Sequence, residues 1–152
     1  MKKVAFIFPG QGSQTIGMGK DFFENNDIAK EMISKASARL DVDFEKLLFE
    51  ENENLGKTEF TQPAILLVSS IANAIFKEKC NIIPEFVLGH SLGEFSALVA
   101  AGAIDYLDAI ELVHRRGLFM TEACSGGGAG MMALVGIDDY AVEKICEEQR
   151  DA

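Results

Sequence analysis

The stretch "LGHSLGE", residues Leu88 to Glu94, places one serine between two glycines directly after a short apolar run. Glycines two positions before and after Ser91 fit the pattern G-x-S-x-G, in which the backbone turns sharply between a strand and a helix and exposes the serine hydroxyl. Residues 86–88 predict the strand, and the apolar face that begins at Leu92 predicts the helix. The alternative is a glycine-flanked helix cap whose serine only satisfies backbone N–H groups. The strand–turn–helix frame favours Ser91 as a nucleophile.

Strands and helices alternate on both sides of this stretch. Residues Val4 to Phe8 form a continuous apolar run, which is typical of a parallel strand covered on both faces. Apolar residues at helical spacing predict helices over residues 27–39 and 105–120. A third helix, with Pro63 in its first turn and its end near Lys79, is apolar almost all round and is therefore expected to be buried. This alternation predicts an α/β fold with a parallel sheet.

The best candidate for a linker follows Ser125, where four of the next five residues are glycine. Beyond it, the pattern predicts a strand at Met131 to Val135 and a helix from Asp138 to Glu148. A lone strand and helix cannot bury their own apolar faces. We therefore expect residues 1–124 to form one core, and residues 125–152 to be a linker and the start of a second, truncated subdomain.

Composition excludes several classes of function. The chain of 152 residues has 24 acidic and 14 basic residues, and its net charge of −10 disfavours nucleic acid and anionic membranes as partners. The apolar run at residues 4–8 is too short for a signal peptide, and the longer run at residues 64–76 contains three polar residues. We therefore expect a cytoplasmic protein. Cys80, Cys124 and Cys146 are odd in number and far apart, which suits neither a disulfide framework nor a zinc site.

The glycines of "FPGQGSQTIGMG", residues 8–19, suggest two nucleotide-binding motifs that both fail. Gly10 and Gly12 begin G-x-G-x-x-G, but Thr15 holds the last glycine position. Gly12 to Gly17 has the spacing of a phosphate loop, but Met18 stands where the lysine is needed. A glycine loop at the carboxyl edge of the sheet remains, and its backbone N–H groups are suited to bind an oxyanion.

Two adjacent arginines differ in their surroundings. Arg115 has Glu111 four residues earlier, which predicts an ordinary surface ion pair. Arg116 has no acid within one helical turn and borders the apolar face of its helix. It therefore pairs with a distant acid, extends to solvent, or binds the carboxylate of a ligand through both guanidinium nitrogens.

The chain has two histidines, and neither is a convincing base for Ser91. His90 is the neighbour of Ser91 in sequence, and adjacent side chains at such a turn point in different directions. His114 lies on the flank of the helix predicted at 105–120, where a half-buried structural histidine is expected.

The sequence resembles the malonyl-CoA:acyl-carrier-protein transacylase family, the malonyltransferases of bacterial fatty-acid synthesis. The resemblance lies in "FIFPGQGSQ" at 6–14, "TQPA" at 61–64, "GHSLGEFSAL" at 89–98 and "RRG" at 115–117, which occur in the family's order. It implies an α/β-hydrolase-like core of parallel strands. It also implies a small ferredoxin-like subdomain, which here would start near Ala129.

The resemblance also implies an activity and a role for each site residue. Ser91 would take the malonyl group from malonyl-CoA and pass it to the phosphopantetheine thiol of acyl carrier protein. The backbone N–H groups of Gln11 and Leu92 would form the oxyanion hole. Arg116 would hold the malonyl carboxylate, and Gln62 would line the pocket. No metal and no cofactor are expected.

The family's catalytic histidine lies in a second half that has no counterpart in this sequence. We therefore expect an incomplete enzyme that works with its missing C-terminal half. Two alternatives stay open. One is a serine esterase or thioesterase with the same turn at Ser91, although an enzyme that hydrolyses neutral esters needs no cation such as Arg116 in its acyl pocket. The other is a non-catalytic fragment that folds only with the missing half.

Overall fold

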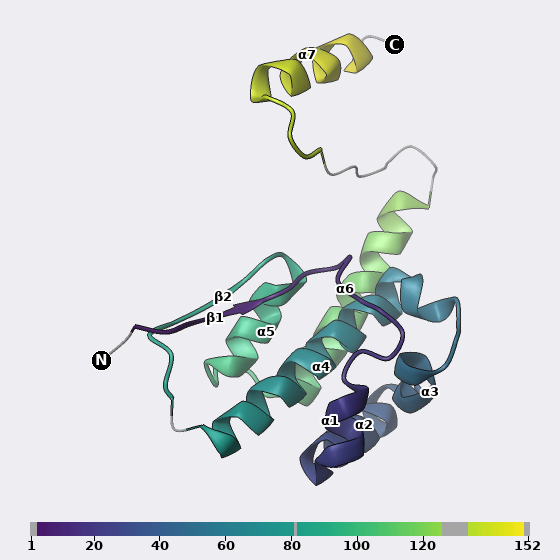
Figure 1. The fold of residues 1–152 in the computed structure, drawn as a ribbon. Helices are drawn as coiled ribbons and strands as arrows, with labels where there is room; N and C mark the ends of the chain where they lie inside the picture. The colour runs from purple at the N-terminus through teal and green to yellow at the C-terminus, as the bar shows by residue number, and fades with distance from the viewer. Residues whose placement is uncertain (1–2, 81, 126–133, 151–152) are drawn as a thin grey trace.

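The computed structural model describes residues 3–80, 82–125 and 134–150. Two short strands, β1 (Ala5–Phe8) and β2 (Phe86–Gly89), pair in parallel, with Ala5 opposite Phe86 and Phe8 opposite Gly89. The predicted α/β fold with a parallel sheet is thereby confirmed (Figure 1). The helices are α1 (Lys20–Asn25), α2 (Asp27–Leu40), α3 (Phe44–Phe49), α4 (Thr58–Lys79), α5 (Leu92–Ala100), α6 (Tyr106–Cys124) and α7 (Asp139–Arg150), with a 3-10 turn at Asn54–Gly56.

The sheet is covered on one face. Helix α5 packs against both strands, and Phe6 of β1 meets Phe76 of α4 edge to face, with ring centroids 5.2 Å apart. On the other face, Ile7 is 75% exposed and Phe86 is 63% exposed. The prediction that the first strand is covered on both faces is therefore wrong for the described residues, because their helices supply a cover on one side only.

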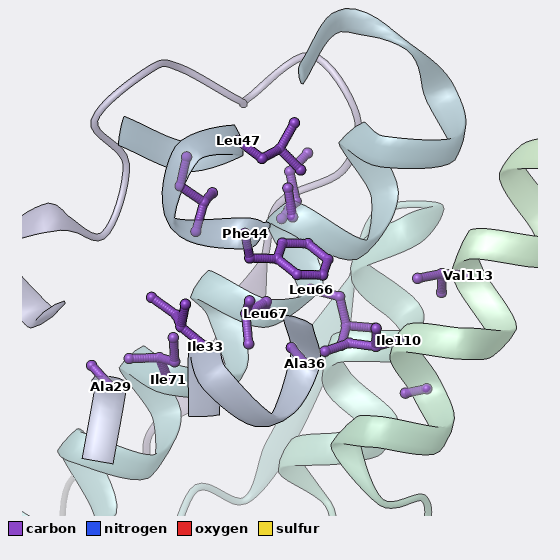
Figure 2. Packing of buried hydrophobic residues seen from close by; sticks show 14 of the residues in the cluster. Ala29, Ile33, Ala36, Phe44, Leu47, Leu66, Leu67, Ile71, Ile110 and Val113 are labelled. Atoms are coloured by element: carbon purple, nitrogen blue, oxygen red, sulfur yellow. The ribbon is translucent and has the colours of Figure 1, made fainter. Parts of the chain in front are cut away.

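The main core lies among the helices and not against the sheet. Helix α4 runs through its centre, and α2, α3 and α6 surround it (Figure 1). Figure 2 shows how side chains from these four helices interlock around the Phe44 ring. The fully buried members include Phe44, Leu48, Leu66, Leu67, Ile110 and Val113. This packing holds α4 and α6 in a fixed relation, on which the candidate site depends.

Helix α4 begins at Thr58, so Pro63 is its sixth residue and lies beyond the first turn in which it was predicted. Proline has no N–H, so the carbonyl of Glu59, one turn earlier, loses its helical hydrogen-bond donor. The Nδ1 atom of His114, on α6, lies 2.8 Å from that carbonyl oxygen. His114 therefore satisfies the backbone group that Pro63 leaves open, and the proline is tolerated inside the helix.

Helix α4 is long and apolar enough, by length and composition alone, to cross a membrane. Of its most apolar 18-residue window, 67% is buried inside the protein. Packing against the surrounding helices therefore accounts for its apolar composition.

An aspartate side chain accepts a backbone N–H at the start of each of the two later helices. The Asp105 carboxylate accepts the Leu107 N–H at the start of α6, and the Asp138 carboxylate accepts the Ala141 N–H at the start of α7. The glycine linker and the first three residues of the strand predicted at 131–135 lie outside the described residues, and Leu134 and Val135 are not in a strand. The second subdomain stays a prediction.

Candidate functional site

Ser91 occupies a sharp turn between β2 and α5. Its φ is 53° and its ψ is −104°, a conformation that residues other than glycine rarely adopt. The flanking glycines are required by space. A Cβ atom at Gly89 would collide with the backbone of Gly93, and a Cβ atom at Gly93 would collide with the backbone of Phe8. The pattern read from the sequence therefore has a steric cause, and it exposes Ser91 at the carboxyl end of the sheet.

The side chain of Ser91 does not cap the helix that follows it. Its Oγ atom instead accepts a hydrogen bond from the NH2 group of Arg116, at 3.2 Å. The alternative hypothesis, that Ser91 only caps the helix, is therefore wrong. The hydroxyl is free to face a ligand.

Arg116 approaches Ser91 from α6 and is held by neutral groups. Its NH1 group donates to Oε1 of Gln62 at 2.6 Å, and its Cζ atom lies 5.7 Å from the centroid of the Phe95 ring. Gln62 itself is completely buried on α4. Three of the predicted site residues, Ser91, Arg116 and Gln62, thus meet although they come from three different helices or turns.

Arg115 behaves as the sequence predicted. Its NH2 group lies 2.6 Å from Oε1 of Glu111, and Arg39 of α2 lies 3.0 Å from the other oxygen of the same carboxylate. The hydrogen bond from Arg39, together with the charge of Arg115, lowers the pKa of Glu111. Within the described residues, Arg116 has no carboxylate within 4.0 Å, so its charge is left for another partner.

The glycine loop after β1 lies directly against the turn of Ser91. The His90 N–H donates to the Phe8 carbonyl at 3.2 Å, and a Cβ atom at Gly10 would lie 2.6 Å from the His90 carbonyl oxygen. The Gln11 side chain is tied to Thr58 Oγ1 at 3.1 Å. These contacts fix the backbone of Gln11 beside the turn.

Several backbone N–H groups near Ser91 are unused. Others are occupied: the Gly93 N–H donates to the His90 carbonyl and the Gly12 N–H donates to Gln14 Oε1. Across the described ranges, the N–H groups of Gln11 and Leu92 have no acceptor. Both were predicted as oxyanion donors. Leu92 is also the first residue of α5, where the helix dipole favours negative charge.

Gly117 brings α4 and α6 together, and the sequence reading missed it. A Cβ atom at Gly117 would lie 2.5 Å from the Glu59 Cα atom and 2.8 Å from the Thr58 carbonyl oxygen. The absence of a side chain lets the helices cross closely, one residue away from the contact of Arg116 with Gln62. A glycine in the interior of a predicted helix was the available signal, because such a glycine costs stability unless packing requires it.

A largely apolar hollow of about 620 Å³ opens beside Arg116. It lies between α5 and α6, and the guanidinium is at its wall. This arrangement suits a ligand with one apolar part and one negative charge. The lining residues are Phe95, Leu112, Arg115, Arg116, Phe119, Met120 and Ala123.

Neither histidine serves Ser91 in the described part of the chain. His114 is committed to the Glu59 carbonyl of α4. His90 is exposed, and its Nδ1 atom lies close to Gly10 of the glycine loop. No group of three or more potential metal ligands occurs among the described residues.

Comparison with known proteins gives one family for nearly the whole chain. The acyl transferase domain family matches residues 5–150. Malonyl CoA-acyl carrier protein transacylases from Staphylococcus aureus (strain MSSA476) and Bacillus subtilis (strain 168) are each 45% identical over 97% of this chain. The match covers 47% of each of those proteins, so the chain spans about half the length of the curated relatives it matches.

Solved structures agree with this comparison. The crystal structure of a malonyl-CoA:acyl carrier protein transacylase from Helicobacter pylori has a TM-score of 0.92 and 47% identity, over 97% of this chain and 48% of that one. A malonyl-transacylase solved in complex with its type II PKS acyl-carrier protein has a TM-score of 0.85 and 37% identity, over the same share of each chain.

Proposed function

The chain belongs to the acyl transferase domain family, and on that premise we propose that its complete protein transfers a malonyl group from malonyl-CoA to acyl carrier protein. The observation that carries the proposal is the 3.2 Å contact between Arg116 and Ser91 Oγ, at a guanidinium with no carboxylate partner within the described residues. A nucleophile beside a free cation suits an acyl group that itself bears a negative charge.

Transfer proceeds in two steps through Ser91. In the first, Oγ attacks the thioester carbonyl, the C–S bond breaks, CoA leaves as its thiol, and Ser91 carries the malonyl group as an ester. In the second, the phosphopantetheine thiol of acyl carrier protein attacks that ester, a new thioester C–S bond forms, the bond between the malonyl carbon and Ser91 Oγ breaks, and Ser91 regains its proton. Each step passes through a tetrahedral oxyanion, which the unused N–H groups of Gln11 and Leu92 would stabilise.

Arg116 selects and orients the acyl group. The two nitrogens of the guanidinium match the two oxygens of a carboxylate. In malonyl thioesters a single carbon separates the carboxylate from the reacting carbonyl, so the cation and the nucleophile must be close neighbours. Their contact through Ser91 Oγ supports a short diacid over a longer one.

The general base that the reaction needs would come from outside this chain. Removing the proton of Ser91 requires a base, which contributes about 10²–10⁴-fold to the rate. By resemblance, a histidine of the missing C-terminal half supplies it. The share of relatives that this chain covers supports such a partner segment. We place the complete protein in the cytoplasm, where malonyl-CoA and acyl carrier protein would meet it.

A serine thioesterase is the second candidate, and one experiment separates the two. The complete protein is incubated with malonyl-CoA without acceptor, and peptides are mapped by mass spectrometry. We expect a stable malonyl group on Ser91, absent from Ser91→Ala, that leaves when acyl carrier protein is added. Rapid release of malonate without an acceptor would favour the thioesterase. An acyl group on a cysteine that persists in Ser91→Ala would exclude Ser91 as the nucleophile.

A further inference from the structure

We propose that Gln62 is a positioning residue whose neutral charge makes the site select an acyl group with a carboxylate. The inference rests on the proposed function and adds a determinant of its specificity. Gln62 would hold Arg116 in place without neutralising the positive charge of the guanidinium. Phe95 would support it from the other side.

Gln62 is built to present its oxygen to Arg116. The side chain is completely buried on α4, and Oε1 accepts the Arg116 NH1 group at 2.6 Å. Its Nε2 group faces the Sδ atom of Met120 at 3.4 Å. The opposite orientation of the amide would set its NH2 against the guanidinium, donor against donor, and is excluded. The amide therefore has one usable orientation, and it fixes NH1.

Every partner of Arg116 in the described residues is neutral. They are the amide of Gln62, the aromatic face of Phe95 and the hydroxyl of Ser91. Arg39 and Arg115, by contrast, bind the Glu111 carboxylate. A carboxylate in place of the Gln62 amide would have nearly the same shape and would form a stronger, charge-assisted hydrogen bond. It would also cancel the charge that a substrate carboxylate needs.

Two consequences follow for acyl donors. A donor with a carboxylate, such as malonyl-CoA, is bound by a cation already oriented, which lowers KM. A neutral donor, such as acetyl-CoA, gains nothing from Arg116 and leaves the cation without a charged partner in an apolar hollow. The choice between them is thus set by a residue that need not touch the substrate.

The test compares Gln62→Glu with Gln62→Met in the complete protein, with both malonyl-CoA and acetyl-CoA as donors. Gln149→Glu is the matched control, because it makes the same chemical change on the exposed surface of α7. For Gln62→Glu we expect the ratio of kcat/KM for malonyl-CoA to that for acetyl-CoA to fall about tenfold or more, chiefly through KM for malonyl-CoA. Gln62→Met frees Arg116 without opposing its charge and should lower the ratio by only about two- to fivefold.

Equal losses for both donors in both variants would overturn the inference, because they would mean that Gln62 only packs the core. An unchanged ratio in Gln62→Glu would also overturn it. If Gln62→Glu does not fold, the shift in KM for Gln62→Met decides. Failure of the proposed function has a different signature: the unmodified protein would then show no preference for malonyl-CoA over acetyl-CoA.

Discussion

Apolar residues line both the crossing of α4 and α6 and the sheet of β1 and β2, but the sheet leaves one apolar face exposed. At the crossing, Leu66, Leu67 and Val113 are completely buried. In the sheet, Ile7, Phe86 and Leu88 are each more than half exposed. The difference lies in what surrounds them, because the helices bury the contact between α4 and α6, whereas the described helices cover only one face of the sheet.

The candidate site is divided in the same way. Arg116 and Gln62 stand on the closed crossing, where Arg116 donates a hydrogen bond to Gln62. Ser91 stands on the open sheet, and it has no base within the described residues. The same missing element would supply both a cover for the sheet and a base for the serine. This coincidence supports the proposal that the rest of the protein packs on the open face.

The largest expected effect concerns that open face. Expressed alone, residues 1–152 should transfer malonyl groups about 10²–10⁴-fold more slowly than the complete protein, which is the contribution of a general base. The exposed apolar face should also favour aggregation or association. Adding the separately expressed C-terminal half should restore both solubility and rate, measured by light scattering and by malonyl transfer.

Ile7→Ser is a useful control for this experiment. It removes apolar surface from the open face, so it should improve the solubility of the short chain and weaken rescue by the second half. Full activity from residues 1–152 alone would show that the chain contains its own base, and would return His90 and His114 to consideration.

The next largest effect concerns Arg116, which stands on the crossing of α4 and α6 and contacts Ser91 at the end of the sheet. Charge-assisted hydrogen bonds are worth about 1.5–3 kcal/mol, so Arg116→Ala should lower kcat/KM for malonyl-CoA more than tenfold in the complete protein. Transfer from acetyl-CoA should be spared or improved. Arg115→Ala is the neighbouring control and should change little, because Arg115 binds Glu111 at the surface. Equal losses for both donors in Arg116→Ala would make Arg116 structural.

The sequence predicted the features that depend on local geometry. The turn at Ser91 was readable because its two glycines are required by the turn itself. Helix α6 was readable from the periodicity of its apolar residues. The ion pair of Arg115 with Glu111 was readable because four residues separate partners on one helical face.

Features that depend on contacts between distant segments were not readable. The sequence suggested that Pro63 lies in the first turn of its helix, because nothing local shows that His114 supplies the donor that proline lacks. The role of Gly117 depends on Glu59, which lies on another helix. The hydrogen bond between Gln62 and Arg116 joins residues 54 positions apart. The local sequence therefore indicated that Arg116 lacks a nearby acid, but it could not indicate that Gln62 binds it.

A smaller effect is expected at the closed crossing. Gly117→Ala should lower the free energy of unfolding by about 1–3 kcal/mol, because the new methyl group would press against the backbone of α4. Gly56→Ala is the matched control, since no atom lies within 4 Å of its added Cβ, and it should change stability by less than about 0.5 kcal/mol. Urea unfolding followed by circular dichroism measures both. A Gly117→Ala protein as stable as the control would mean that the crossing can open at no cost.

The smallest effect tests how the crossing tolerates a proline. His114→Phe keeps the aromatic packing near Phe60 but removes the donor to the Glu59 carbonyl, so it should cost about 1 kcal/mol of unfolding free energy. Pro63→Ala restores a helical N–H for the same carbonyl. In that background His114→Phe should cost much less. The two single variants and the double variant form a cycle in which the entropic effect of removing proline cancels. A coupling energy of about 1 kcal/mol, measured by urea unfolding, is expected. Strictly additive losses would show that His114 and the open carbonyl are neighbours without an energetic link.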